Sequence, residues 1–157
     1  MRRATFLLIV LALIAYTNGT EVQKCKGSNT RKLEPDEVSL SNCEKNKCIL
    51  RRKTDANIMI KLKPEKDIKS LTNEISAIIL DVPLPFPGVY GTSACDNIFD
   101  AEGKNKVGCP LKAGETYTYK SSFRIHEFYP SVSLVVHWAL NDGNRDEICF
   151  EIPARIK

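Results

Sequence analysis

The chain has few of the side chains that carry out chemistry at neutral pH. It contains only two histidines and one tryptophan in 157 residues. His126 and His137 fall on the polar faces of predicted strands, where a solvent-facing imidazole is the simpler interpretation. No phosphate-binding glycine loop is present, and Gly91–Cys95 matches a nucleophile elbow for only three residues. The sequence therefore favours a binding protein over an enzyme, with no cofactor and no metal.

Long hydrophobic runs are also scarce. The single clear run, residues 6–15, is too short to cross a bilayer, which needs about 20 residues. Two arginines precede it, and small or polar residues follow it up to Gly19, as in a secretory signal peptide. We therefore expect residues 1–19 to be a signal peptide cut near Gly19 or Thr20, and residues 20–157 to form one secreted, extracellular domain.

The chain has little excess charge of either sign. Its net charge of +4 falls to +2 without residues 1–19, because two of the 23 basic residues lie there and all 19 acidic residues lie beyond. A net charge this small does not indicate the strongly basic surface that is typical of nucleic-acid-binding proteins. A local basic cluster is formed by Lys45, Lys47, Arg51, Arg52 and Lys53. Its simplest interpretation is a solvated hairpin face, and the alternative is attraction to an anionic membrane.

Cysteine, in contrast, is well represented, and all six residues lie in the exported part. An even number in an oxidising environment predicts three disulfides. Six cysteines allow fifteen pairings, and short spacing favours two of the pairs below, which leaves the third. The expected pairs are Cys43–Cys48, Cys95–Cys109 and Cys25–Cys149. Zinc is a weak alternative, because no paired CxxC or HxxxH motif follows the first pair.

Four segments alternate apolar and polar residues with a period of two, which is typical of strands with one buried face. Their apolar positions are Ala56, Ile58, Ile60 and Leu62; Tyr117, Tyr119, Phe123 and Ile125; Leu134, Val136, Trp138 and Leu140; and Phe150, Ile152, Ala154 and Ile156. The more continuously apolar run from Leu71 to Leu80 predicts a strand buried on both faces. With no convincing helical period, the pattern predicts an all-β antiparallel sandwich.

The run Val82–Pro87 has a proline at every second position, with Val, Leu and Phe between them. Proline fixes φ, donates no N–H and forces the preceding residue into an extended conformation. The run can be neither a helix nor a central strand, and we expect a rigid extended loop. Its apolar side chains should cover either the protein core or a hydrophobic ligand.

An ordered set of motifs makes the chain recognisable. The set is Pro83-Leu84-Pro85-Phe86-Pro87, Cys95, Cys109-Pro110-Leu111, Tyr117-Thr118-Tyr119, Tyr129-Pro130-Ser131, Leu134-Val135-Val136-His137-Trp138 and Cys149-Phe150-Glu151-Ile152-Pro153. It resembles the Niemann-Pick type C protein two family of the ML, or lipid-recognition, superfamily, and the overall character is similar to arthropod members. The resemblance covers nearly all of the exported chain.

The resemblance implies an immunoglobulin-like β-sandwich of two antiparallel sheets with a hydrophobic cavity between them, and the same three disulfides. It also implies that Phe86, Ile125, Tyr129 and Pro130 line the mouth of the cavity. Periodicity alone would assign to the core a further set that the fold places around the ligand: Ile58, Ile60, Phe123, Val136 and Trp138. In the proline run, we expect Phe86 to touch ligand while Val82 and Leu84 seal the core.

The implied function is passive transport of a sterol, fatty acid or similar hydrophobic small molecule, including semiochemicals. The carrier would be a monomer that contacts a membrane surface or a receptor. The alternative is an innate-immune recognition protein that presents microbial lipid to a receptor, as other ML relatives do. A lipid-modifying enzyme is the least supported hypothesis, since only the two histidines could serve it.

Overall fold

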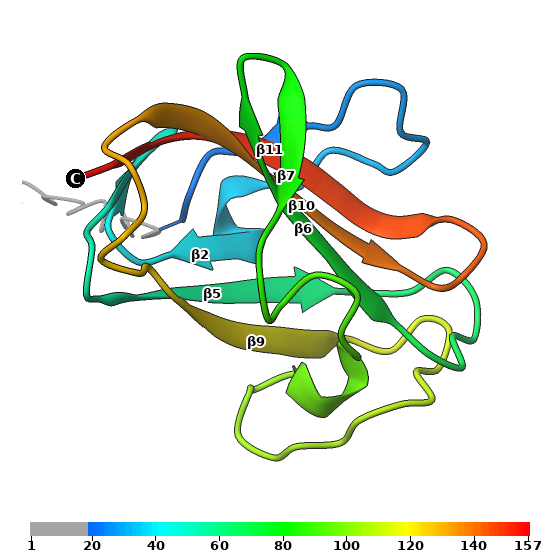
Figure 1. Cartoon of the computed structure of the whole chain (residues 1–157). Coiled ribbons are helices and arrows are strands. Elements are labelled where there is room, and N and C mark those ends of the chain that lie inside the picture. The colour runs from blue at the N-terminus through cyan, green and yellow to red at the C-terminus, as the bar shows by residue number, and fades with distance from the viewer. Residues whose placement is uncertain (1–18) are drawn as a thin grey trace, which may run out of the picture.

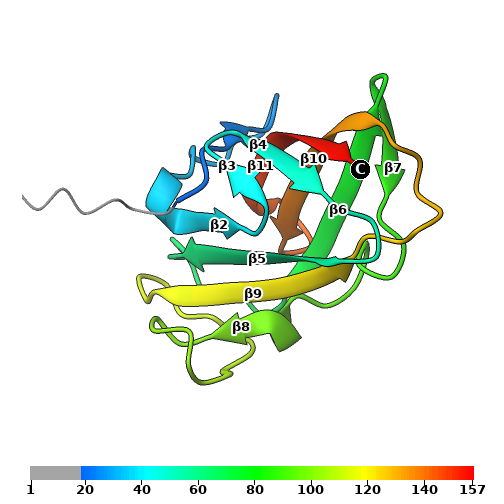
Figure 2. The same ribbon diagram turned by 90° about the vertical axis from the view of Figure 1, so that its left-hand side faces the viewer.

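The computed structural model describes residues 19–157, which form two β-sheets packed face to face (Figures 1 and 2). No α-helix occurs among these residues, and none of their helical turns has the length and apolarity needed to cross a membrane. The prediction of an all-β sandwich is confirmed. The predicted signal peptide, residues 1–19, lies outside the described residues except for Gly19 and stays a prediction.

The larger sheet has the strand order β3-β4-β11-β10-β6-β7, with β1 also paired to β11. Its strands are β1 (Gln23–Lys24), β3 (Cys43–Glu44), β4 (Lys47–Leu50), β6 (Thr72–Ile79), β7 (Val82–Pro85), β10 (Ser133–Asn141) and β11 (Asp146–Ile156). The smaller sheet has the order β2-β5-β9-β8. Its strands are β2 (Val38–Leu40), β5 (Asp55–Leu62), β8 (Ile98–Phe99) and β9 (Tyr117–Arg124). Two short 3-10 turns complete the set, η1 (Pro35–Glu37) and η2 (Cys95–Asn97).

One pairing departs from the expected antiparallel sheets, because β4 runs parallel to β11. A parallel pair needs a long connection, and here almost a hundred residues of chain lie between the two strands. The chain contributes β1 and the β3–β4 hairpin to the larger sheet before β5, and its next strand in that sheet is β6. All other strand pairs are antiparallel, as predicted.

The predicted alternation places the core correctly. Along β5 every second residue from Ala56 to Leu62 is buried and the residues between them are exposed. The apolar positions of β9, β10 and β11 are buried in the same way and join one cluster between the sheets. The predicted strand in the run Leu71–Leu80 is present as β6, but its expected burial on both faces is only partial, because Glu74 and Ile78 are half-buried. Leu80 lies beyond the strand in the β6–β7 turn, at φ 49° and 93 % exposed.

The proline run is an edge strand rather than a loop. Pro83 and Pro85 lie opposite Ile78 and Ser76 of β6, and the Phe86 N–H donates to the Ile75 carbonyl at 3.0 Å. Alternate residues of an edge strand point their N–H groups inward and outward, so the prolines occupy the outward positions, where a ladder bond is not needed.

Val82 and Leu84, in the same strand, are 55 % and 49 % exposed. The expectation that they seal the core is therefore wrong. All four residues of β7 are exposed, so neither face of this edge strand is covered by a second layer.

All three predicted disulfides are present, and the described residues contain no free cysteine. Cys25–Cys149 joins the N-terminal segment to β11, and Cys43–Cys48 closes the β3–β4 hairpin. Cys95–Cys109 closes the loop that carries η2 and β8.

Candidate functional site

Four aromatic rings form a row that runs between the sheets, and we call it the aromatic row. Phe86 follows β7, Phe123 and Tyr119 come from β9, and Trp138 comes from β10. The ring centroids of Phe86 and Phe123 are 5.3 Å apart, those of Phe123 and Trp138 are 5.8 Å apart, and those of Trp138 and Tyr119 are 6.2 Å apart. Both sheets thus contribute to one continuous series of buried rings that begins at an edge of the sandwich.

Strand register explains why these rings meet. Tyr119, Ser121 and Phe123 alternate along β9 and share its inner face, opposite Ile60, Ile58 and Ala56 of β5. Trp138, at the centre of β10, faces this stretch from the other sheet, as its contacts with Tyr119 and Phe123 require.

The other predicted lining residues lie around the row. Ile58, Ile60 and Val136 are buried and belong to the same core cluster as the four rings. Because side chains of both sheets pack against one another here, a ligand between the sheets would have to move some of them. Their assignment to a ligand site stays a prediction.

Three of the four predicted mouth residues, Ile125, Tyr129 and Pro130, lie in the loop from β9 to β10, and the fourth, Phe86, follows β7. Ile125 is fully buried, and its backbone is held by bonds from Lys53 N–H to its carbonyl (2.7 Å) and from its own N–H to Thr54 (2.9 Å). Tyr129 is half-buried and packs against the core, and this burial raises the pKa of its hydroxyl. Pro130 is exposed. The structure therefore brings Phe86, Ile125 and Tyr129 to the core cluster and leaves Pro130 outside it.

A buried polar group near Tyr119 was not found from the sequence. The Tyr119 hydroxyl donates to Asn73 Oδ1 at 2.7 Å, and Asn73 Nδ2 donates to Thr92 Oγ1 at 3.0 Å. Burial raises the pKa of Tyr119 to about 12, so the phenol stays neutral at physiological pH. The only signal was an asparagine within the apolar run of β6.

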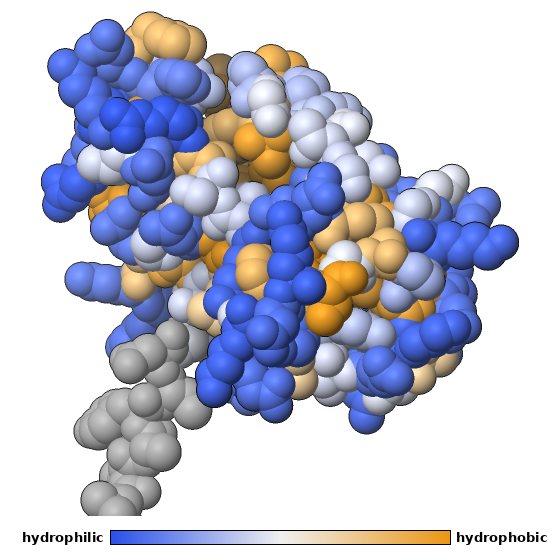
Figure 3. All heavy atoms as spheres, turned by 90° about the horizontal axis from the view of Figure 1, so that it is seen from below, coloured by the Kyte–Doolittle hydropathy of each residue, from blue (hydrophilic) through white to orange (hydrophobic). Residues whose placement is uncertain are grey.

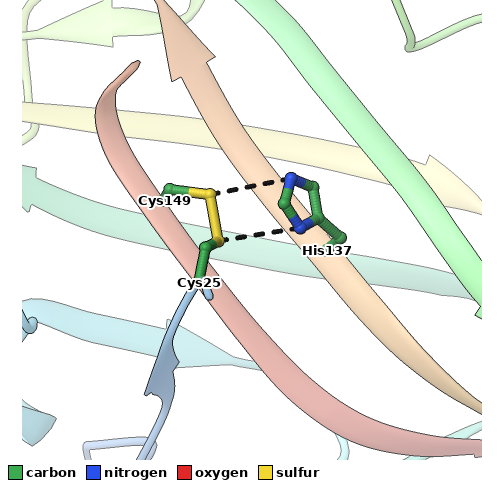
Figure 4. A group of neighbouring side chains, drawn as sticks. All are labelled: Cys25, His137 and Cys149. Atoms are coloured by element: carbon green, nitrogen blue, oxygen red, sulfur yellow. Dashed lines mark hydrogen bonds between the residues drawn. A yellow bond between two sulfur atoms is a disulfide. The ribbon is translucent and has the colours of Figure 1, made fainter. Parts of the chain in front are cut away.

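His137 lies against the Cys25–Cys149 disulfide (Figure 4). Its Nδ1 is 3.6 Å from Cys25 Sγ, its Nε2 is 3.6 Å from Cys149 Sγ, and Nδ1 is also 3.1 Å from Glu151 Oε1. Both sulfurs are bonded to each other, so they offer no thiolate to a metal ion.

The prediction of solvent-facing histidines holds for His126, which is exposed, but is wrong for His137, which is half-buried. The N-terminal segment pairs with β11 through β1 and brings Cys25 over the outer face of the sheet beside His137. Sequence periodicity could not show this cover.

The hollows on the outside of the molecule have a different character. One of 550 Å³ lies on the outer face of the smaller sheet, lined mainly by short polar side chains such as Ser41, Asn57 and Ser122, and of the predicted ligand residues it includes only Ile58. Another, of 330 Å³, is lined both by charged residues such as Arg31 and by apolar ones such as Leu33 and Ile148, and by none of the predicted ligand residues. Seen from below, hydrophilic and hydrophobic residues are interspersed on the surface (Figure 3).

Comparison with known proteins agrees with the fold. A family profile described as ML domain matches residues 19–156. The chain belongs to the ML family. Relatives of this ML protein include the ecdysteroid-regulated 16 kDa protein of Manduca sexta, 35% identical over 69% of this chain and 70% of that protein. The NPC intracellular cholesterol transporter 2 homolog a of Drosophila melanogaster is 30% identical over 93% of both chains.

A solved structure shows the same fold. A Niemann-Pick type C2 protein from Japanese carpenter ant has a TM-score of 0.64 and 29% identity, covering 76% of this chain and 89% of that one. Together with the insect relatives, this likeness identifies an arthropod ML protein of the NPC2 type and confirms the predicted membership.

Proposed function

We propose that this ML protein is a secreted, monomeric carrier that binds a sterol, fatty acid or similar lipid between its two sheets. The observation that carries the proposal is the aromatic row, because it leads from an edge of the sandwich into its centre through side chains of both sheets. The names of the relatives support it, since the Drosophila protein and its counterpart in Canis lupus familiaris are cholesterol transporters. Residues 1–19 would be the signal peptide.

The binding step is passive and needs no catalytic group. A lipid enters where Phe86 packs on Phe123, because this contact joins the edge strand to the opposite sheet. Burying roughly 400 to 500 Å² of lipid surface at about 25 cal/mol per Å² contributes on the order of 10 kcal/mol before the costs of ordering and association. The ligand thereby replaces the ring contacts that it separates.

The mouth of the site is formed by Phe86, Ile125, Tyr129 and Pro130, with Ile58, Ile60 and Val136 further inside. Tyr129 suits a rim because its ring is half-buried and contacts His126 and Phe128 in the exposed part of its loop. An aromatic ring adds contact area at a small cost in conformational entropy.

The same end of the molecule has the features of a membrane-contacting surface. Phe128 is 74 % exposed, and the basic residues Arg51, Arg52 and Lys53 are exposed beside its loop, with Arg52 Nη1 donating to the Tyr129 carbonyl at 3.4 Å. Exposed apolar side chains flanked by basic ones bind anionic lipid surfaces. A carrier whose entrance lies beside such a surface can exchange its ligand without releasing it into water.

The test is a displacement assay on the delipidated secreted protein with a fluorescent fatty acid and a fluorescent sterol. We expect saturable binding that Tyr129→Ala weakens about tenfold, since an aromatic rim side chain in a binding site contributes 1 to 2 kcal/mol. Tyr90→Ala is the matched control, because Tyr90 is an exposed tyrosine outside the proposed mouth. No saturable binding by the wild-type protein would refute the proposal.

A further inference from the structure

The hollow of 330 Å³ at the end of the sandwich away from the C-terminus has the build of a small-molecule site. Three segments that are far apart in the sequence form it, residues 27–33, 62–68 and 145–148. In Figure 1 these segments lie on the side of the molecule opposite the C-terminus. Its volume falls in the range of roughly 300 to 1,000 Å³ that is usual for ligand pockets. We call it the distal pocket.

The floor of the distal pocket is aliphatic. Leu33, Leu62, Ile68 and Ile148 line it, and each of them is at most 5 % exposed. Leu62 comes from the smaller sheet and Ile148 from the larger one, and all four belong to the core cluster. No aromatic side chain is among the lining residues in the described part of the chain. The floor therefore suits a flexible alkyl chain better than a flat ring, which aromatic side chains would stack on.

One wall of the distal pocket is held in place before any ligand arrives. The Cys25–Cys149 disulfide ties the start of the N-terminal segment to β11, directly beside Ile148. Further along this segment, Thr30 Oγ1 donates to the Cys149 carbonyl at 3.5 Å, and the Thr30 N–H donates to Ser28 Oγ at 3.2 Å. A wall fixed in this way loses little conformational freedom when a ligand binds, which favours affinity.

The charges around the distal pocket cancel. Three basic and three acidic side chains line it, namely Arg31, Lys63 and Arg145 with Glu65, Asp146 and Glu147. Both arginines already have partners, because Arg31 Nη2 lies 2.6 Å from Glu37 and Arg145 Nε lies 3.0 Å from Glu147. An ionic head group would lose hydration here without meeting a net opposite charge. A hydroxyl head group can accept from the basic side chains and donate to the acidic ones.

We propose that the distal pocket is a second binding site, which takes a small neutral aliphatic amphiphile such as a medium-chain alcohol. The alkyl chain lies on the floor and the hydroxyl lies among the charged side chains. At about 30 Å³ for each non-hydrogen atom, the pocket holds roughly eleven such atoms, the size of 1-decanol. The site goes beyond the lipid site proposed between the sheets, since none of the residues assigned to that site lines it.

The first experiment locates the bound probe. Delipidated protein carrying ¹³C-labelled isoleucine and leucine methyl groups is titrated with 1-decanol and followed by NMR. We expect saturable shifts of the Leu62 and Ile148 methyl signals, because these side chains line the distal pocket. The Ile58 and Ile125 methyl groups report on the lipid site between the sheets. Shifts confined to Ile58 and Ile125, or no saturable shift at all, would overturn the proposal.

The second experiment tests the neutral head group with decanoate and decyltrimethylammonium beside 1-decanol. On the Ile148 methyl signal, we expect 1-decanol to bind at least about fivefold more tightly than either ion, since the charges of the pocket sum to zero. An ion that binds as tightly as the alcohol would overturn the assigned ligand class.

A charge variant gives the sharper form of this test. Lys63→Glu makes the lining charge −2, so the affinity for decyltrimethylammonium should rise about fivefold while that for 1-decanol stays unchanged. Lys61→Glu is the matched control, because Lys61 is an exposed lysine of β5 outside the pocket and the substitution changes the charge equally. Equal gains in both variants would show that the cation responds to overall charge and does not bind in the pocket.

The proposal and the carrier function fail independently. Saturable binding of a fluorescent fatty acid without any shift of Leu62 or Ile148 refutes only the distal pocket. Shifts of Leu62 and Ile148 with 1-decanol, in a protein that binds neither fluorescent lipid, refute only the carrier function.

Discussion

The two ends of the sandwich differ in whether their side chains have partners within the chain. At one end, which we call the polar end, Lys66 Nζ lies 2.5 Å from Asp142 Oδ2 and 3.5 Å from Glu147, and Arg145 Nε lies 3.0 Å from Glu147. At the other, the aromatic end, Phe128 stands largely in solvent and Leu80 occupies the tip of the neighbouring hairpin. The C-terminus marks the aromatic end in Figure 1.

This difference suggests that one end contributes mainly to the stability of the fold and the other mainly to the proposed binding. The polar end joins its turns through charged groups that have partners within the chain, whereas the aromatic end exposes apolar side chains that the proposed membrane contact would cover. Regions that bind ligands often keep exposed apolar side chains that do not stabilise the free protein, and the rest of the fold supplies the stability. Changes at the polar end should therefore alter stability with little effect on lipid binding between the sheets, and changes at the aromatic end should do the reverse.

The largest effect is expected from removing the Cys25–Cys149 bridge, which lies toward the polar end, where Thr30 Oγ1 bonds to the Cys149 carbonyl. The double substitution C25S/C149S should lower the free energy of unfolding by about 5 kcal/mol, because the bridge closes a loop with a sequence separation of 124.

Urea unfolding measures this loss, and C43S/C48S is the matched control. That bridge has a sequence separation of only 5, so its removal should cost about 2 kcal/mol. Equal losses for the two pairs would show that loop length does not govern their contributions.

The second prediction concerns Phe86 and Leu84, which lie two residues apart along the same edge. Phe86→Ala should weaken lipid binding at least tenfold and lower the free energy of unfolding by about 3 kcal/mol, because the buried ring contacts Phe123. Leu84→Ala should change the free energy of unfolding by less than about 0.5 kcal/mol and leave binding intact, because Leu84 is half exposed. Displacement and urea titrations on both variants separate the two outcomes. A similar loss of binding in both would contradict the assigned mouth.

The third prediction uses the acid sensitivity of the polar end. The Lys66 ammonium, together with bonds from the Arg145 and Asn144 N–H groups, holds the pKa of Asp142 well below its usual value. A lowered folded-state pKa contributes stability above the unfolded pKa of about 4, and this contribution is lost as the pH falls through the acid range. Asp142→Asn should therefore be less stable than wild type at pH 7, and the gap should narrow below pH 4. A gap independent of pH would exclude the ion pair as its source.

The smallest effect is expected at the tip of the β6–β7 hairpin. Leu80 has a φ of 49° and Asp81 a φ of 64°, as in a turn that prefers asparagine and glycine. Leu80→Asn should raise the free energy of unfolding by about 0.5 to 1 kcal/mol, since asparagine tolerates this conformation better than leucine. The same change should reduce binding to anionic vesicles, because it removes an exposed apolar side chain. A variant that is both stabilised and unchanged in vesicle binding would show that Leu80 has no part in membrane contact.

The sequence predicted the sandwich well, because its long strands have one buried face and their alternation is a local property. Spacing also predicted the three disulfides. What it could not predict depends on contacts between distant segments. His137 is covered because the N-terminal segment pairs with β11, and β4 is parallel to β11 because of a connection that no local pattern records.

For the candidate site, alternation identified Phe123 and Trp138 as inner residues but could not show how their rings meet. The proline run shows the limit most clearly. Its chemistry excluded a central strand, yet only the pairing with Ser76 and Ile78 shows that it is an edge strand with Val82 and Leu84 facing solvent.

That edge strand has a consequence for the behaviour of the protein in concentrated solution. A sheet normally ends in a row of free N–H groups onto which the strand of another molecule can add, which is how fibres start. Here Pro83 and Pro85 occupy the outward positions, so these places have no N–H to offer. The apolar residues between them can stay exposed without recruiting a second chain. The protein can therefore expose apolar side chains along this edge, even at high protein concentration, and still resist polymerisation.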